Sequence, residues 1–162
     1  MRLIALYVLA LVVAACANND PASNDPEWSR LEAERSACQA RMVASPQFRA
    51  LQDRLQGNSF DERKATPAEA AQMVVFHQDY LRPCQEVDLE IAGRTHLSLV
   101  PLYNAAATKA DANIANLVTY QISWGDYVRT GRTIRLDLNG QLAAAKVALQ
   151  LPSLNGLDLS TN

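Results

Sequence analysis

The chain has 162 residues, with 15 basic and 17 acidic side chains and a formal net charge of −2. This length is sufficient for one domain with a sizeable core. The mildly acidic balance gives no reason to expect a nucleic-acid partner. Aromatic residues make up only 6% of the chain and alanine is abundant, which favours helices over sheets. We therefore expect an all-α fold, a small helical bundle.

The N-terminus has the pattern of a secretory signal. Met1-Arg2 is followed by an apolar stretch from Leu3 to Ala15 that ends in small residues. A helix that crosses a membrane needs about 20 apolar residues, so this stretch is too short. A cationic start, a short apolar segment and small residues before a cleavage site are typical of a signal peptide. We expect residues 1–15 to be removed.

The run Val13-Ala14-Ala15-Cys16 resembles the lipobox of bacterial lipoproteins. The resemblance implies that Cys16 becomes the first mature residue, carries a diacylglycerol thioether and usually a third acyl chain such as palmitate, and anchors the protein to the membrane. Two or more acyl chains suffice for stable attachment. Ala17, where inner-membrane lipoproteins of enteric bacteria carry aspartate, implies an outer-membrane, periplasm-facing location. The alternative is an ordinary secretory signal followed by a chance cysteine.

Two further cysteines, Cys38 and Cys84, remain once Cys16 is assigned to lipid. A pair of cysteines in an oxidising compartment is expected to form a disulfide. Closing that loop would stabilise the fold by roughly 4 kcal/mol in the chain-entropy model. The absence of a Cys-x-x-Cys motif argues against a redox role. We interpret the pair as a structural link between two packed helices.

The first half of the mature chain predicts a tether followed by helices. Residues 16–25 are polar and are expected to form a flexible tether reaching roughly 15–20 Å, and the helical domain should span residues 26–150. Asp25-Pro26 and Ser45-Pro46 are predicted helix starts, and residues 58–65 should form a loop. The apolar positions expected to face the core are Trp28, Leu31, Cys38, Met42, Phe48, Leu51 and Leu55.

Thr66-Pro67-Ala68-Glu69 combines a capping box with proline and predicts the next helix start. The helix should run to Pro83. Its expected apolar face comprises Ala70, Met73, His77 and Leu81, joined by Cys84 if the register continues past the proline. The following segment, ending at Gly93, alternates apolar and acidic residues, so residues 87–91 have a short strand as an alternative.

Pro101 is expected to open a helix whose apolar face holds Tyr103, Ala107, Ala110, Ile114 and Leu117. Ser123 and Asp126 then form a second capping box, with Ile122 as a hydrophobic staple. A long apolar stripe follows, comprising Trp124, Tyr127, Gly131, Ile134, Leu138, Leu142, Ala145 and Leu149. A hairpin at Asn139-Gly140 is the competing interpretation. Residues 151–162 are expected to be a flexible tail.

Residues 117–142 also show a weaker resemblance. The Ile-Ser-x-x-Asp-aromatic pattern from Ile122 to Tyr127 resembles short helical-hairpin modules found near the ends of bacterial proteins. Gln121 stands where those modules usually have glycine. The resemblance implies a helical hairpin, and such modules are associated with oligomerisation.

The sequence contains no recognisable catalytic motif, metal-ligand set or cofactor-binding motif. We interpret His77 as a histidine at the edge of the core rather than as a haem or metal ligand, and His96 as a loop residue. Glu86, Asp88 and Glu90 would form a weak cation site on a strand but would be solvated on a helix. The remaining candidate is a surface patch of Arg129, Arg132 and Arg135, with Arg135 bordering the core and a solvated face as the default.

These observations favour a non-enzymatic envelope lipoprotein. We expect it to have a binding or structural role, without a cofactor, and to contact another envelope protein or further copies of itself. The alternative is a periplasmic ligand-binding or hydrolase-inhibitor module. An enzyme of the peptidoglycan layer would need acidic or histidine pairs that only the fold could bring together.

Overall fold

The computed structural model describes residues 25–55 and 59–151, and within these ranges every regular element is helical. The predicted all-α class is therefore confirmed. The elements in chain order are α1 (Pro26–Ala44), α2 (Pro46–Leu55), α3 (Pro67–Phe76), the π-helical turn η2 (His77–Leu81), α4 (Arg82–Thr95), the 3-10 turn η3 (Leu97–Leu99), α5 (Val100–Val118) and α6 (Trp124–Leu149).

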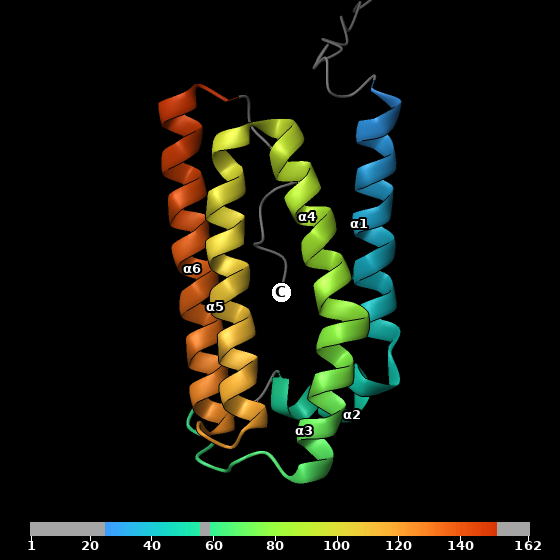
Figure 1. Cartoon of the computed structure of the whole chain (residues 1–162), viewed down its shortest axis with the longest axis vertical. Helices are drawn as coiled ribbons and strands as arrows, with labels where there is room; N and C mark the ends of the chain where they lie inside the picture. The colour runs from blue at the N-terminus through green and yellow to red at the C-terminus, as the bar shows by residue number, and fades with distance from the viewer. Residues whose placement is uncertain (1–24, 56–58, 152–162) are drawn as a thin grey trace, which may run out of the picture.

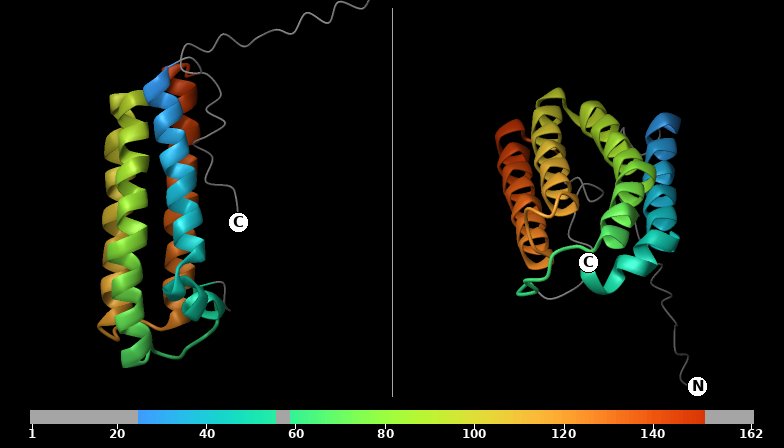
Figure 2. Two further views of the ribbon diagram at one scale, coloured as in Figure 1. Left: turned by 90° about the vertical axis from the view of Figure 1, so that its right-hand side faces the viewer. Right: turned by 60° about the horizontal axis from the view of Figure 1, so that its bottom comes forward.

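The long helices stand side by side in a bundle (Figure 1). Helix α6 packs on α5, α5 packs on α4, and α4 packs on α1, so the order across the bundle is α6, α5, α4, α1. Helices α2 and α3 lie together at one end of the bundle, where α2 also touches α6 (Figure 2). Helix α1 begins and helix α6 ends at the opposite end. The start of α1 and the end of α6 therefore lie at the same end of the bundle.

The predicted helix starts are confirmed in their capping geometry. The Asp25 side chain accepts a hydrogen bond from the amide of Glu27 at 3.0 Å. Thr66 and Glu69 bond each other's backbone amides at 3.2 and 2.8 Å. Ser123 and Asp126 do the same at the start of α6. Side-chain oxygens at these positions satisfy amides that have no partner within the helix, which is why the local sequence was sufficient to locate the starts.

The rod from α3 to α4 continues through Pro83 without a break. Proline has no amide hydrogen, and its ring collides with the carbonyl four residues earlier in a regular α-helix. Here the preceding turn is widened into the π-helix η2, and the amide of Arg82 donates to the carbonyl of His77, five residues back. The wider turn accommodates Pro83. Phe76, at the end of α3, is buried and His77 is only partly buried, so the predicted apolar face of this helix omitted one core residue.

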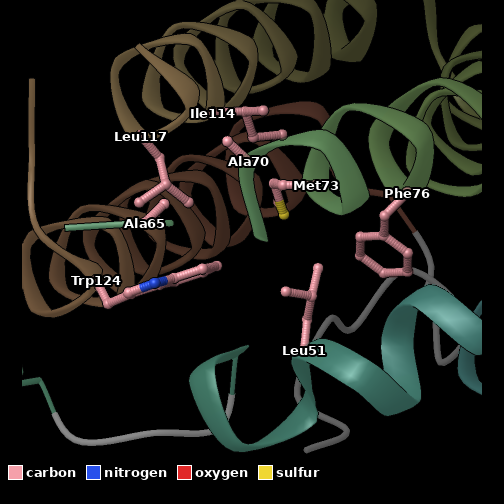
Figure 3. Packing of buried hydrophobic residues seen from close by; sticks show 8 residues of the cluster. All are labelled: Leu51, Ala65, Ala70, Met73, Phe76, Ile114, Leu117 and Trp124. Atoms are coloured by element: carbon pink, nitrogen blue, oxygen red, sulfur yellow. The ribbon is translucent and has the colours of Figure 1, made fainter. Parts of the chain in front are cut away.

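The core consists of two buried clusters, one toward each end of the bundle. One cluster contains Leu31, Ile91, Ala92, Leu99, Tyr103, Leu138 and Leu142. The other contains Leu51, Ala65, Ala70, Met73, Phe76, Ile114, Leu117 and Trp124 (Figure 3). The two clusters contain residues from the apolar stripes predicted for α1, α2, α5 and α6.

Two alternative interpretations and one predicted helix end are wrong. Residues 87–91 belong to α4 and form no strand, because the apolar residues Val87 and Ile91 lie one helical turn apart and Ile91 is buried. Gly93 does not end this helix, which continues to Thr95 before His96 becomes extended. Asn139-Gly140 forms no hairpin, since both residues lie inside α6, whose buried positions Leu138 and Leu142 flank them at helical spacing.

Candidate functional site

One exposed apolar surface of the described chain is the outer face of α6. We use this name for Leu136, Gly140, Ala143 and Val147, all of which are exposed. Leu136 and Val147 leave 62% and 81% of their surface accessible. At 100° per residue the four positions lie within about 60° of one another, on the side of α6 opposite the buried Leu138 and Leu142. Helix α6 therefore carries two apolar faces, of which only one is covered by its own chain.

The outer face of α6 is sterically accessible because of the position of α6 in the bundle. Helix α6 lies at one edge of the bundle beside α5 in Figure 1, and its inward side contributes Leu138 and Leu142 to the core cluster that also contains Leu31 of α1. A Cβ atom added to Gly140 would meet no heavy atom within 4 Å. Large exposed apolar residues aligned on one helix face are a feature of interaction surfaces.

The three arginines of α6 do not form a uniform cationic patch. Arg129 binds the Asp126 carboxylate at 2.5 Å, and it also donates to the carbonyl of Ser59. Hydrogen bonds from Ser123 and the nearby Arg129 hold the pKa of Asp126 below its usual range. Arg132 and Arg135 are both exposed. The prediction that Arg135 borders the core is therefore wrong. Arg132 borders the outer face of α6, Arg129 lies in line with this face two turns before Leu136, and Arg135 lies away from it.

The loop of residues 59–65 docks against the start of α6. The amide of Trp124 donates to the carbonyl of Arg63 at 2.9 Å, and the amide of Gly125 donates to the carbonyl of Asp61 at 2.7 Å. These amides belong to the first turn of α6 and have no partner within the helix. Gly125 permits the close approach, because a Cβ there would lie 2.7 Å from the Ser59 oxygen. Apart from Gly125 itself, no local sequence pattern predicts this contact.

Asp61 holds that loop in shape. Its carboxylate binds Arg63 at 2.7 Å and Arg54 at 3.2 Å, and Arg54 also binds Glu69 at 2.9 Å. The hydrogen bonds from Arg63 lower the pKa of Asp61 from 3.8 to about 2. The carboxylate is therefore a structural anion that links the loop to α2.

The two histidines have structural partners. His77 Nε2 lies 2.8 Å from a carboxylate oxygen of Asp111 on α5, and its side chain is mostly covered, as expected for a histidine at the edge of the core. His96 Nδ1 accepts a hydrogen bond from the amide of Ser98 at 3.2 Å and so caps η3. Within residues 25–55 and 59–151, no group of three or more His, Cys, Asp or Glu side chains is placed to hold a metal ion.

Glu86 and Glu90 lie on one side of α4 and Asp88 on the opposite side, and the described residues include no group of acidic side chains that could hold a metal ion. Asp88 binds Arg35 of α1 at 2.9 Å, with only 22% and 13% of the two side chains exposed. Burial raises the pKa of Asp88. Our expectation that all three are simply solvated is wrong for Asp88, because helix α1 covers its side of α4. Glu86 and Glu90 are exposed and form surface ion pairs with Arg82 and Arg94.

The predicted disulfide joins α1 to α4. Cys38 and Cys84 are bonded, with their Cα atoms 5.6 Å apart and a sequence separation of 46. Cys38 is 3% exposed. The bond therefore lies inside the helix–helix contact, as the two apolar stripes predicted.

The remaining predictions concern residues outside the described range. These are the signal peptide 1–15, lipidation at Cys16, residues 16–24 of the tether, and residues 152–162 of the tail. Among the helices that the structure does describe, none has the length and apolar character needed to span a membrane. No family model matches the chain, and no curated protein or solved structure matches it.

Proposed function

We propose that this chain is a lipid-anchored protein of the bacterial envelope whose helical domain acts by contact with another macromolecule, not by catalysis. The anchor would be Cys16, and the domain would face the periplasm from the outer membrane. The single observation that carries the proposal is the lipobox-like run Val13-Cys16, which directly precedes a polar segment and the helical domain.

The disulfide supports the compartment independently of the N-terminus. Cys38 and Cys84 lie at bonding geometry across the α1–α4 contact. Disulfides of this kind persist in the periplasm and outside the cell and are rare in the cytosol. The pair agrees with an exported domain, which is also what the N-terminal residues imply.

The surface supports the contact role. The outer face of α6 exposes Leu136 and Val147 on the side of the helix opposite the buried Leu138 and Leu142. The side chains that could have served chemistry instead bind structural partners. His77 pairs with Asp111, and Asp88 pairs with Arg35. These contacts favour a scaffold that presents a surface.

Membrane fractionation of cells that express the full chain or its Cys16→Ser variant tests the anchor. We expect the wild-type chain in the membrane fraction and the variant in the soluble periplasmic fraction. Both should show the same helical circular dichroism, since Cys16 lies outside the helices. A wild-type chain that is soluble would contradict the anchor.

Crosslinking in cells with a tagged full chain tests the contact role. We expect crosslinked adducts of the wild-type chain, and fewer of them when Leu136 and Val147 are replaced by aspartate. A matched control replaces Gln141 by aspartate, because Gln141 is exposed on α6 but lies off the outer face. Recovery of uncrosslinked monomer alone would refute the contact role without affecting the anchor.

A further inference from the structure

The spacing on the outer face of α6 indicates what covers it. Leu136, Gly140, Ala143 and Val147 follow one another at steps of four, three and four residues. This is the alternation of the apolar seam in two-stranded helical pairs, where the side chains of one helix fit between those of the other. Gly140 and Ala143 in the centre of the seam would let two helices approach closely, with a larger apolar residue on either side.

We propose that α6 pairs in parallel with α6 of a second copy of this chain, through the outer face of α6 on both. In this arrangement each seam residue faces its own counterpart, so that Leu136 meets Leu136 and Val147 meets Val147. The pairing deepens the proposed function by naming its partner, and its orientation rests on the anchor proposed there.

Charge beside the seam favours the parallel register. Arg132 and Asp137 flank the outer face of α6 on opposite sides, five residues apart. In a parallel helix pair, side chains at this offset meet across the seam, so each Arg132 would face Asp137 of the other copy. Within the chain, the Asp137 carboxylate lies 3.8 Å from the Lys109 ammonium, near the upper limit for an ion pair, and both side chains are about half exposed. An antiparallel pair would leave Arg132 without this acidic partner.

The position of the anchor favours the same orientation. The chain outside the described range enters α1 at the end of the bundle where α6 terminates (Figure 1). A parallel pair has a twofold axis along α6, so both copies present this end in the same direction. Two chains held by Cys16 in one leaflet could then pair while upright.

The size of the seam predicts that the pairing depends on the membrane. From Leu136 to Val147 the helix rises only about 16 Å, and a helix is about 10 Å wide. Stable protein interfaces bury about 800 Å² on each partner, several times the area of such a contact. Pairing should therefore be weak in dilute solution and substantial when anchoring raises the effective concentration.

Cysteine scanning of the full chain in intact cells tests the pairing. The variants Leu136→Cys, Gly140→Cys, Ala143→Cys and Val147→Cys should each give a disulfide-linked dimer on non-reducing gels after mild oxidation. The matched control Gln141→Cys places an exposed cysteine about 130° away on the same helix and should give at least fivefold less dimer. The wild-type chain, whose Cys38 and Cys84 are bonded to each other, should give none.

The pattern decides between the arrangements. A parallel pair crosslinks at all four seam positions, whereas an antiparallel pair would crosslink at Gly140→Cys and Ala143→Cys but not at the outer two. That second pattern, equal dimer at Gln141→Cys, or no dimer at any seam position would overturn the proposal. If the chain fractionates with the membrane but does not crosslink, the pairing fails while the anchor stands. If it crosslinks but is soluble, the anchor fails.

The flanking charges provide a second test in the Val147→Cys background. Arg132→Glu should reduce the dimer by between about twofold and tenfold, the range expected for the loss of exposed ion pairs. Adding Asp137→Arg reverses both charges and should restore the dimer. Failure of the double variant to recover, when the single variant is impaired, would rule out the proposed contact between these two side chains.

Discussion

Replacing Gly125 by alanine should destabilise the domain even though Gly125 lies in a helix. Alanine is favoured over glycine inside a helix by about 1 kcal/mol. At this position, however, the added Cβ would lie 2.7 Å from the Ser59 oxygen and 2.9 Å from the amide and carbonyl of Asp61. All three atoms belong to the backbone and cannot rotate away. The loop of residues 59–65 would therefore have to move off the start of α6.

The cost can be worked out from the contacts that would be lost. Steric overlap in a packed site costs about 1–3 kcal/mol. Moving the loop also weakens two hydrogen bonds, from Trp124 to Arg63 and from Gly125 to Asp61, each of which contributes about 1 kcal/mol. After subtracting the helix preference of alanine, we expect a loss of about 2–4 kcal/mol. For a domain of this size the melting temperature should fall by about 6–12 °C.

Thermal unfolding followed by circular dichroism measures this effect. Gly131→Ala is the matched control, because it lies in the same helix and its added Cβ would come no closer than 4.0 Å to Asn113. The control should be neutral or slightly stabilising. If Gly125→Ala stabilises the protein as much as Gly131→Ala does, the loop does not dock on α6 as described.

Three further predictions concern groups inside the domain. Asp61→Asn should lower stability at neutral pH. Because folding lowers the pKa of Asp61 from 3.8 to about 2, the stability difference from wild type should be present above pH 4 and disappear as the pH falls toward 2. Urea unfolding at a series of pH values measures this difference, and a pH-independent difference would contradict the ion pairs. Replacing Cys38 and Cys84 together by serine should cost about 4 kcal/mol in urea unfolding, and free alkylation of both thiols in an unreduced wild-type sample would show that the bond is absent. Arg35→Met should cost about 2–4 kcal/mol by leaving Asp88 unpaired under α1, and adding Asp88→Leu should recover most of the loss; an unaffected single variant would refute the pair.

The sequence predicted those parts of the fold that depend on neighbouring residues. Helix starts at Asp25, Thr66 and Ser123 are encoded within a few positions, because a cap needs only one side chain and the next turn. The apolar stripes and the Cys38–Cys84 bond followed from helical spacing together with the cysteine count.

The failures come from contacts between distant segments and from one altered turn. Nothing near Pro83 signals that the preceding turn widens, so the helix appeared to stop there. The docking of Asp61 on Gly125 and the covering of Asp88 by α1 join segments more than 50 residues apart. The spacing of apolar residues within one helix does not show which other helix or loop packs against it.

The outer face of α6 was missed for a different reason. Its four residues were present in the sequence at helical spacing, but the longer stripe through Leu138 and Leu142 was assigned to the core first. Only the burial of that stripe showed that Leu136 and Val147 lie on the opposite side, where the chain does not cover them. A search for a second apolar stripe on the same helix would have found the face.

The central claim is that the chain is held in the membrane through Cys16. Mass spectrometry of the N-terminal peptide from protein purified out of cell membranes tests it most directly. We predict a mature chain that begins at Cys16 and carries diacylglycerol on its sulfur, with a third acyl chain on the amine where the host adds one. A chain that retains Met1, or that begins elsewhere with Cys16 absent or unmodified, would contradict the account.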